Sequence, residues 1–126
     1  MPAGLPVLVV DDQVDVRESL AFLLELKGYA VVTAADGREA LGQMRRGVRP
    51  GLILLDLMMP DMDGLEFRRE QLKDPQLSTV PIVVCSAHPD ATSTAERLGA
   101  AACLPKPLNI DRLLSLVAAH CAPQRA

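Results

Sequence analysis

The stretch LILLDLMMPDMDG, residues 52–64, decides the fold of this chain. Four aliphatic residues, 52–55, are followed directly by Asp56, and the chain then reaches the turn-forming residues Pro60 and Gly64. A short continuous apolar run bounded by turn residues is typical of a strand that is buried on both faces of a parallel sheet. The carboxylate at the end of this run either merely ends the strand or is presented for chemistry. Which of the two holds depends on the other residues that meet it at the same edge.

Apolar runs alternate with amphipathic stretches along the whole chain. Continuous apolar runs predict strands over 5–10, 29–34, 51–56, 80–87 and 101–105. Helical spacing of apolar residues predicts helices over 14–27, 64–72 and 89–100. Two further helices are predicted to begin at capping residues, one from Asp36 through Met44 and one from Asn109 onward. The inward face of the last helix is predicted to consist of Leu113, Leu114, Leu116 and Val117. Five strands alternating with five helices predict an α/β fold, a doubly wound parallel sheet covered on both faces.

Composition limits the domain count and the kinds of partner. The 126 residues suit one domain, 1–126, with a core of about 5–121. Hydrophobic residues make up 49% of the chain and aromatic residues only 2%, so the core must be aliphatic. A net charge of −3 argues against direct nucleic-acid binding. The N-terminus does not resemble a signal peptide, and no apolar run approaches the roughly 20 residues of a membrane span, so we expect a cytoplasmic protein without membrane contact.

Polar residues gather where the predicted strands end. Asp11 and Asp12 follow the first strand, Asp56 ends the third, Ser86 ends the fourth and Lys106 follows the fifth. The carboxyl ends of parallel strands meet at one edge, where ligands bind in such sheets. Three neighbouring carboxylates repel one another unless a cation is present, and Mg²⁺ needs only one or two protein carboxylates. An aspartate can also attack phosphorus, so this set predicts a cradle for a phosphoryl group.

These motifs together identify a family resemblance. The segments VVDD (9–12), LLDLMMPDMDG (54–64), CSA (85–87) and LPKP (104–107) resemble the receiver domain of two-component response regulators of the chemotaxis-regulator type. The resemblance extends over about 5–121. It implies a flavodoxin-like fold with strand order 2-1-3-4-5.

The resemblance implies a magnesium site and a phosphoacceptor. Asp56 would accept a phosphoryl group, Asp12 would bind Mg²⁺ directly, and Asp11 would act mainly through water. The backbone carbonyl of Met58 would complete the protein ligands, together with Asp56 itself.

Two further residues would complete the switch. Ser86 would turn its hydroxyl toward the phosphoryl group, and Lys106 would pair with the phosphoryl oxygens, next to a cis Lys106–Pro107 bond. The implied partners are a histidine kinase or histidine phosphotransfer domain and a downstream protein target. The exposed side of the first helix, around Val14 and Arg17, is the predicted kinase-docking surface. The protein would be a signalling phosphoacceptor and not an enzyme.

The fifth strand departs from the family pattern. Cys103 stands three residues before the lysine, where the family usually has Tyr or Phe, so the aromatic part of the switch is missing. Pro105 is tolerated there only if this strand lies at the sheet edge. The three cysteines, Cys85, Cys103 and Cys121, have no metal-site spacing and are expected to be free thiols.

Three other functions compete with a phosphorylated receiver. A haloacid-dehalogenase-type phosphatase needs a second aspartate two residues after Asp56, where this chain has Met58. A nucleotide- or flavin-binding domain needs a glycine-rich phosphate loop, where this chain has DDQVD (11–15). A degenerate receiver that acts only as a phosphorylation-independent docking module remains as the alternative, because of Cys103.

Overall fold

Five parallel strands form one sheet in a computed structural model that describes residues 5–57 and 64–121. The elements in chain order are β1 (Val7–Val10), α1 (Val14–Leu26), β2 (Val31–Ala34), α2 (Gly37–Arg45), β3 (Leu52–Asp56), α3 (Gly64–Lys73), β4 (Ile82–Ser86), α4 (Ala91–Leu98), β5 (Ala102–Pro105) and α5 (Ile110–His120). The strand order is β2-β1-β3-β4-β5, with every neighbouring pair parallel. The expected doubly wound α/β fold and its strand order are confirmed.

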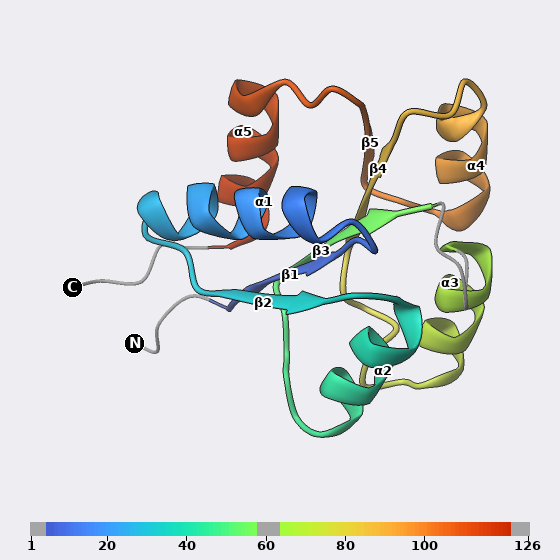
Figure 1. Ribbon diagram of the computed structural model, residues 1–126. Helices are drawn as coiled ribbons and strands as arrows, with labels where there is room; N and C mark the ends of the chain where they lie inside the picture. The colour runs from blue at the N-terminus through green and yellow to red at the C-terminus, as the bar shows by residue number, and fades with distance from the viewer. Residues whose placement is uncertain (1–4, 58–63, 122–126) are drawn as a thin grey trace.

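The helices cover the sheet in two layers (Figure 1). Side chains of α1 and α5 share one hydrophobic cluster with one face of the sheet. Side chains of α2, α3 and α4 share a second cluster with the other face. Within the described residues, no helix has both the length and the apolar composition needed to cross a membrane.

Strand β3 lies at the centre of the sheet and explains the apolar run that precedes Asp56. All five of its residues are buried. Leu52 and Leu54 contribute to the α1–α5 cluster, whereas Ile53 and Leu55 contribute to the opposite cluster. Successive side chains of a strand point to opposite faces, so a strand that is packed on both faces is apolar at its interior positions. The acid can appear only where the strand leaves the core.

Two predicted helix starts are confirmed by their caps. The Asp36 carboxylate accepts a hydrogen bond from the backbone N–H of Glu39 at 2.9 Å. The Asn109 side chain accepts one from the backbone N–H of Arg112 at 3.0 Å. On α5, Leu113 and Val117 are buried as expected, and the half-buried Leu114 and Leu116 pack against the same cluster.

Two polar side chains of α3 make contacts that the sequence did not suggest. Gln71 is fully buried, and its amide donates to the carbonyl oxygens of Leu77 at 2.8 Å and Val80 at 3.0 Å. Arg68 donates to the side chain of Gln71 and to the carbonyl oxygen of Leu98 at the end of α4. These bonds hold the chain before β4 and tie α3 to the C-terminal end of α4.

The central position of β3 gives a stability prediction. Leu54→Ala should lower the free energy of unfolding by about 2–5 kcal/mol, because it leaves a cavity in a close-packed core. Leu72→Ala is the matched control, because Leu72 is 52% exposed whereas Leu54 is 2% exposed. Urea unfolding followed by circular dichroism measures both. Equal losses in the two variants would contradict the assignment of β3 to the core.

Candidate functional site

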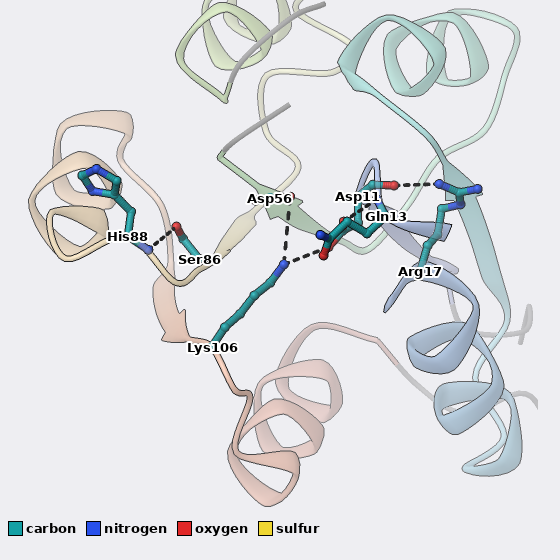
Figure 2. Close-up of polar contacts among 7 residues, drawn as sticks. All are labelled: Asp11, Gln13, Arg17, Asp56, Ser86, His88 and Lys106. Atoms are coloured by element: carbon teal, nitrogen blue, oxygen red, sulfur yellow. Dashed lines mark hydrogen bonds and ion pairs between the residues drawn. The ribbon is translucent and has the colours of Figure 1, made fainter. Parts of the chain in front are cut away.

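The predicted polar residues meet at the carboxyl edge of the sheet. Asp56 and Ser86 are the last residues of β3 and β4, and Asp11 and Lys106 directly follow β1 and β5. Figure 2 shows the side chain of Lys106 extending toward Asp11 and Asp56. A cleft of about 460 Å³ opens there, lined by Asp12, Gln13, Asp56, Ser86, Ala87, His88, Pro89 and Lys106. The sheet therefore brings together every described residue of the predicted site, whereas Met58 lies outside the described residues.

Three carboxylates form an acidic cluster in this cleft. Asp11, Asp12 and Asp56 each place one carboxylate oxygen within 4.8 Å of the others. Asp11 and Asp56 are buried, whereas Asp12 is exposed. Like charges this close oppose one another, and burial strengthens that repulsion. A set of carboxylate oxygens open to solvent on one side is the donor set that a hard divalent cation such as Mg²⁺ prefers.

Lys106 supplies the positive charge within this cluster. Its Nζ lies 3.1 Å from Oδ2 of Asp11 and 4.0 Å from Oδ2 of Asp56, as the dashed lines in Figure 2 show. Burial alone would lower the pKa of Lys106, but the hydrogen bond to Asp11 and the charges of Asp56 and Asp11 outweigh it, so the pKa is raised. Lys106 therefore stays protonated at neutral pH. Its bond to Pro107 is cis, as expected.

Asp11 is fixed by several partners at once. Its Oδ1 accepts a hydrogen bond from the backbone N–H of Gln13 at 2.9 Å, while its Oδ2 faces Lys106. Its carbonyl oxygen accepts from the guanidinium of Arg17 at 2.8 Å. Both carboxylate oxygens of Asp11 are thus engaged, which leaves the exposed Asp12 as the more accessible acid.

The sequence interpretation missed the contact between Arg17 and Asp11, and its kinase-docking surface around Val14 and Arg17 stays a prediction. Val14 is 49% exposed, but Arg17 is half-buried and supports the first strand end. The only signal in the sequence was its spacing, six residues after Asp11. The spacing alone does not predict the hydrogen bond between Arg17 and Asp11, because that bond also depends on the angle between β1 and α1.

Ser86 is almost fully buried, and its hydroxyl oxygen accepts a hydrogen bond from the backbone N–H of His88 at 3.0 Å. In Figure 2 the Ser86 hydroxyl points toward His88. The His88 ring accepts, through Nδ1, the backbone N–H of Asp90 at 3.1 Å. Ser86 therefore belongs to a hydrogen-bonded loop between β4 and α4.

Cys103 occupies the predicted position on β5. It is half-buried and packs against the cluster formed with α2, α3 and α4. Strand β5 lies at the edge of the sheet, and Pro105 there is exposed, as its missing backbone donor requires. All three cysteines are free, as predicted.

The three thiols should differ in reactivity. Burial raises the pKa of the Cys85 thiol to about 12 and that of Cys121 to about 11, so both stay protonated and shielded at pH 8. We expect iodoacetamide at pH 8 to alkylate Cys103 first in the folded protein, because Cys103 is the most exposed of the three. Peptide mass mapping measures this, with guanidinium-unfolded protein, in which all three should react, as the control. Preferential labelling of Cys85 would contradict the burial assigned to it.

The same raised pKa values couple to stability. A thiol whose pKa is higher in the folded state than in the unfolded state keeps its proton longer in the folded protein. Its contribution to the free energy of unfolding is fully present below the pKa of the unfolded state, and it is lost as the pH rises through the pKa of the folded state. For Cys85 that window lies between its ordinary pKa of 9.0 and about 12.

Comparison with known proteins agrees with this geometry. The family model for the response regulator receiver domain matches residues 7–118. The transcriptional regulatory protein CpxR homolog of Haemophilus influenzae is 38% identical over 115 residues, which are 90% of this chain and 48% of that protein. The response regulator MprA of Mycolicibacterium vanbaalenii is 43% identical over 111 residues, 86% of this chain and 47% of that protein. The chain thus spans about half the length of the curated relatives it matches.

Solved structures show the same fold over nearly the whole chain. Chemotaxis protein CheY4 of Vibrio cholerae superposes with a TM-score of 0.82 at 34% identity, covering 92% of this chain and 98% of that one. The response regulator TrrA of Thermotoga maritima, solved in complex with Mg(2+)-BeF, gives a TM-score of 0.79 at 32% identity, covering 91% and 97%. With the family model matched from β1 to within α5, the chain belongs to the response regulator receiver domain family.

Proposed function

We propose that Asp56 is the phosphoacceptor of this receiver domain and that its Mg²⁺-dependent phosphorylation switches the affinity for a protein partner. The observation that carries the proposal is the position of Lys106, whose ammonium group lies between two members of the acidic cluster at the strand ends. Receiver domains are signalling phosphoacceptors rather than catalytic enzymes, and they imply a histidine kinase as partner. A phosphotransfer protein is an equivalent donor, and we expect the reaction to take place in the cytoplasm.

The transfer itself requires little from the protein beyond position and charge. An oxygen of the Asp56 carboxylate attacks the phosphorus of a phosphohistidine, an O–P bond forms, and the P–N bond breaks. The departing imidazole nitrogen keeps the bonding pair and takes a proton. Lys106 supplies positive charge beside the oxygens that become more negative in the transition state. Ser86 would then donate a hydrogen bond from its hydroxyl group to the bound phosphoryl group.

The acidic cluster supports a proposal for the metal ligands. Asp12 and Asp56 would bind Mg²⁺ directly, and Asp11, whose carboxylate oxygens are already engaged, would act mainly through water. The carbonyl of Met58, outside the described residues, remains part of the proposal. When bound, the ion neutralises charge on the carboxylates and the phosphoryl oxygens. The similar protein TrrA was solved in complex with Mg(2+)-BeF, which supports a magnesium site in this chain.

The downstream partner is a protein bound by the surface around α4. The N-terminal end of α4 follows the cleft directly, through the loop that contains His88. The kinase-docking surface that we propose is the exposed side of α1 around Val14 and Arg17, which begins directly after the cleft residue Gln13. Phosphorylation would shift the population between two arrangements of this loop, as charge switches commonly do.

Metal binding should be visible in thermal stability. At a free Mg²⁺ concentration ten times the dissociation constant, binding should stabilise the native protein by about 1.4 kcal/mol. Asp12→Asn should melt at a higher temperature than the wild type without Mg²⁺, because one repelling charge is gone, and should lose most of the Mg²⁺-dependent increase. Asp15→Asn, which changes an exposed aspartate in the first turn of α1, should keep that increase. A full Mg²⁺ response in Asp12→Asn would exclude Asp12 as a ligand.

Phosphorylation can be tested directly by intact-mass spectrometry after incubation with acetyl phosphate. One phosphoryl adduct is expected with Mg²⁺ and none after its removal by chelation. Asp56→Asn should abolish the adduct, whereas Asp111→Asn, an exposed aspartate on α5, should not. An adduct that persists in Asp56→Asn would place the acceptor elsewhere.

Cys103 favours one alternative, a receiver that acts as a docking module without phosphorylation. Its thiol cannot replace the aromatic side chain that the family usually carries on this strand. The alternative is supported if folded, Mg²⁺-loaded protein gains no adduct from acetyl phosphate or from its own kinase.

A further inference from the structure

A chain of hydrogen bonds runs from the candidate switch hydroxyl to the start of α4. The backbone N–H of His88 donates to Oγ of Ser86 at 3.0 Å, and the backbone N–H of Asp90 donates to Nδ1 of His88 at 3.1 Å. The backbone N–H of Ala91 donates to the carbonyl oxygen of His88 at 3.1 Å. His88 therefore contacts Ser86 on one side and the first two residues at the start of α4 on the other, as Figure 2 shows for its bond to Ser86.

Helix α4 begins without the side-chain cap that α2 and α5 have, and His88 accepts hydrogen bonds at its start. Helices α2 and α5 begin with Asp36 and Asn109, whose side chains accept backbone N–H groups of the first turn. Asp90, at the corresponding position of α4, makes no such bond. Backbone N–H groups at a helix start lack partners within the helix, so an outside acceptor stabilises it. His88 supplies two acceptors, the ring Nδ1 and the carbonyl oxygen.

We propose that His88 is a positioning residue that couples the hydroxyl of Ser86 to the first turn of α4. Side-chain torsions occupy staggered positions about 120° apart, so turning the Ser86 hydroxyl toward Asp56 would take Oγ away from the N–H of His88. That N–H would lose its acceptor, and the backbone of His88, together with its ring, would be released. The role in signalling rests on the proposed phosphorylation, whereas the coupling itself belongs to the unmodified protein.

The opposite end of α4 is held in place, which concentrates any movement at the end that follows His88. The guanidinium of Arg68 donates to the carbonyl oxygen of Leu98 at 2.8 Å. Gly99 ends the helix in the left-handed conformation, at φ 70°. The buried Ser86 thus connects to the exposed His88 and to the start of α4 without a side chain from β5. Because this chain has Cys103 in place of an aromatic residue on β5, the loop between β4 and α4 would carry the effect of phosphorylation from Ser86 to α4.

The coupling can be tested without phosphorylation by NMR measurement of amide hydrogen exchange. Ser86→Ala removes the acceptor for the N–H of His88, and His88→Leu removes the ring acceptor for the N–H of Asp90. Both variants should raise the exchange rate of the Asp90 amide, by about twofold to thirtyfold for His88→Leu, the range expected for loss of a helix N-cap. His88→Asn, whose side-chain oxygen can accept the same hydrogen bond, should stay close to the wild type. The Arg112 amide, bonded to Asn109, is the internal control.

Two results would overturn the proposal. An Asp90 exchange rate unchanged by Ser86→Ala would show that the serine hydroxyl is not coupled to α4. Equal exchange in His88→Asn and His88→Leu would show that the hydrogen-bond acceptor of the ring is not what holds the helix start.

The role in signalling is measured on the same amides under sustained acetyl phosphate and Mg²⁺. In the wild type, phosphorylation should raise the exchange rate of Asp90, and His88→Leu should show a smaller increase because its helix start is already released. A phosphoryl adduct without any change at Asp90 would overturn the signalling role. Absence of the adduct would instead refute the proposed function, and the comparison of Ser86→Ala with the wild type would still decide the coupling.

Discussion

The repulsion among three carboxylates at one edge of the sheet is the constraint on which the site depends. Asp11, Asp12 and Asp56 approach within 4.8 Å because the parallel strands that deliver them are neighbours. The arrangement does not stabilise the folded protein, because buried like charges oppose folding. Lys106, brought in by the edge strand, compensates part of that charge. The remaining negative charge is what makes the cleft suited to a divalent cation, and thereby to a phosphoryl group.

The sequence was sufficient to predict the α/β class because the three inner strands, β1, β3 and β4, are buried along their whole length. A strand such as β3 must be apolar along its length, and this makes both the run 52–55 and the acid that ends it visible in the printed sequence. The residues at the strand ends could be predicted for the same reason, since parallel strands deliver their carboxyl ends to a single edge. The cap residues Asp36 and Asn109 were predictable because a cap acts over three residues of sequence.

The contacts that could not be predicted join a helical side chain to a backbone group outside its own helix. Arg17 to the carbonyl of Asp11, Gln71 to Val80 and Arg68 to Leu98 are of this kind. Each depends on how a helix packs against the segments beside it, which the hydrophobic pattern does not specify. A glutamine or an arginine on a helix is usually solvated, so neither residue type signals such a role. The carbonyl of Met58 remains a prediction, because it lies outside the described residues.

The position of Cys103 changes which part of the molecule can transmit a signal. A large aromatic ring on β5 could report the state of the site by moving between buried and exposed positions, but a small thiol packed beside the sheet has no comparable motion. What remains between the cleft and the surface is the loop from Ser86 to α4, in which His88 holds both ends. The other end of α4 is tied to α3 through Arg68. Helix α4 is held at its C-terminal end, so its first turn can rearrange without unfolding of the helix. In the proposed coupling, rotation of the Ser86 hydroxyl is sufficient to start that rearrangement, because His88 connects the hydroxyl to the first turn.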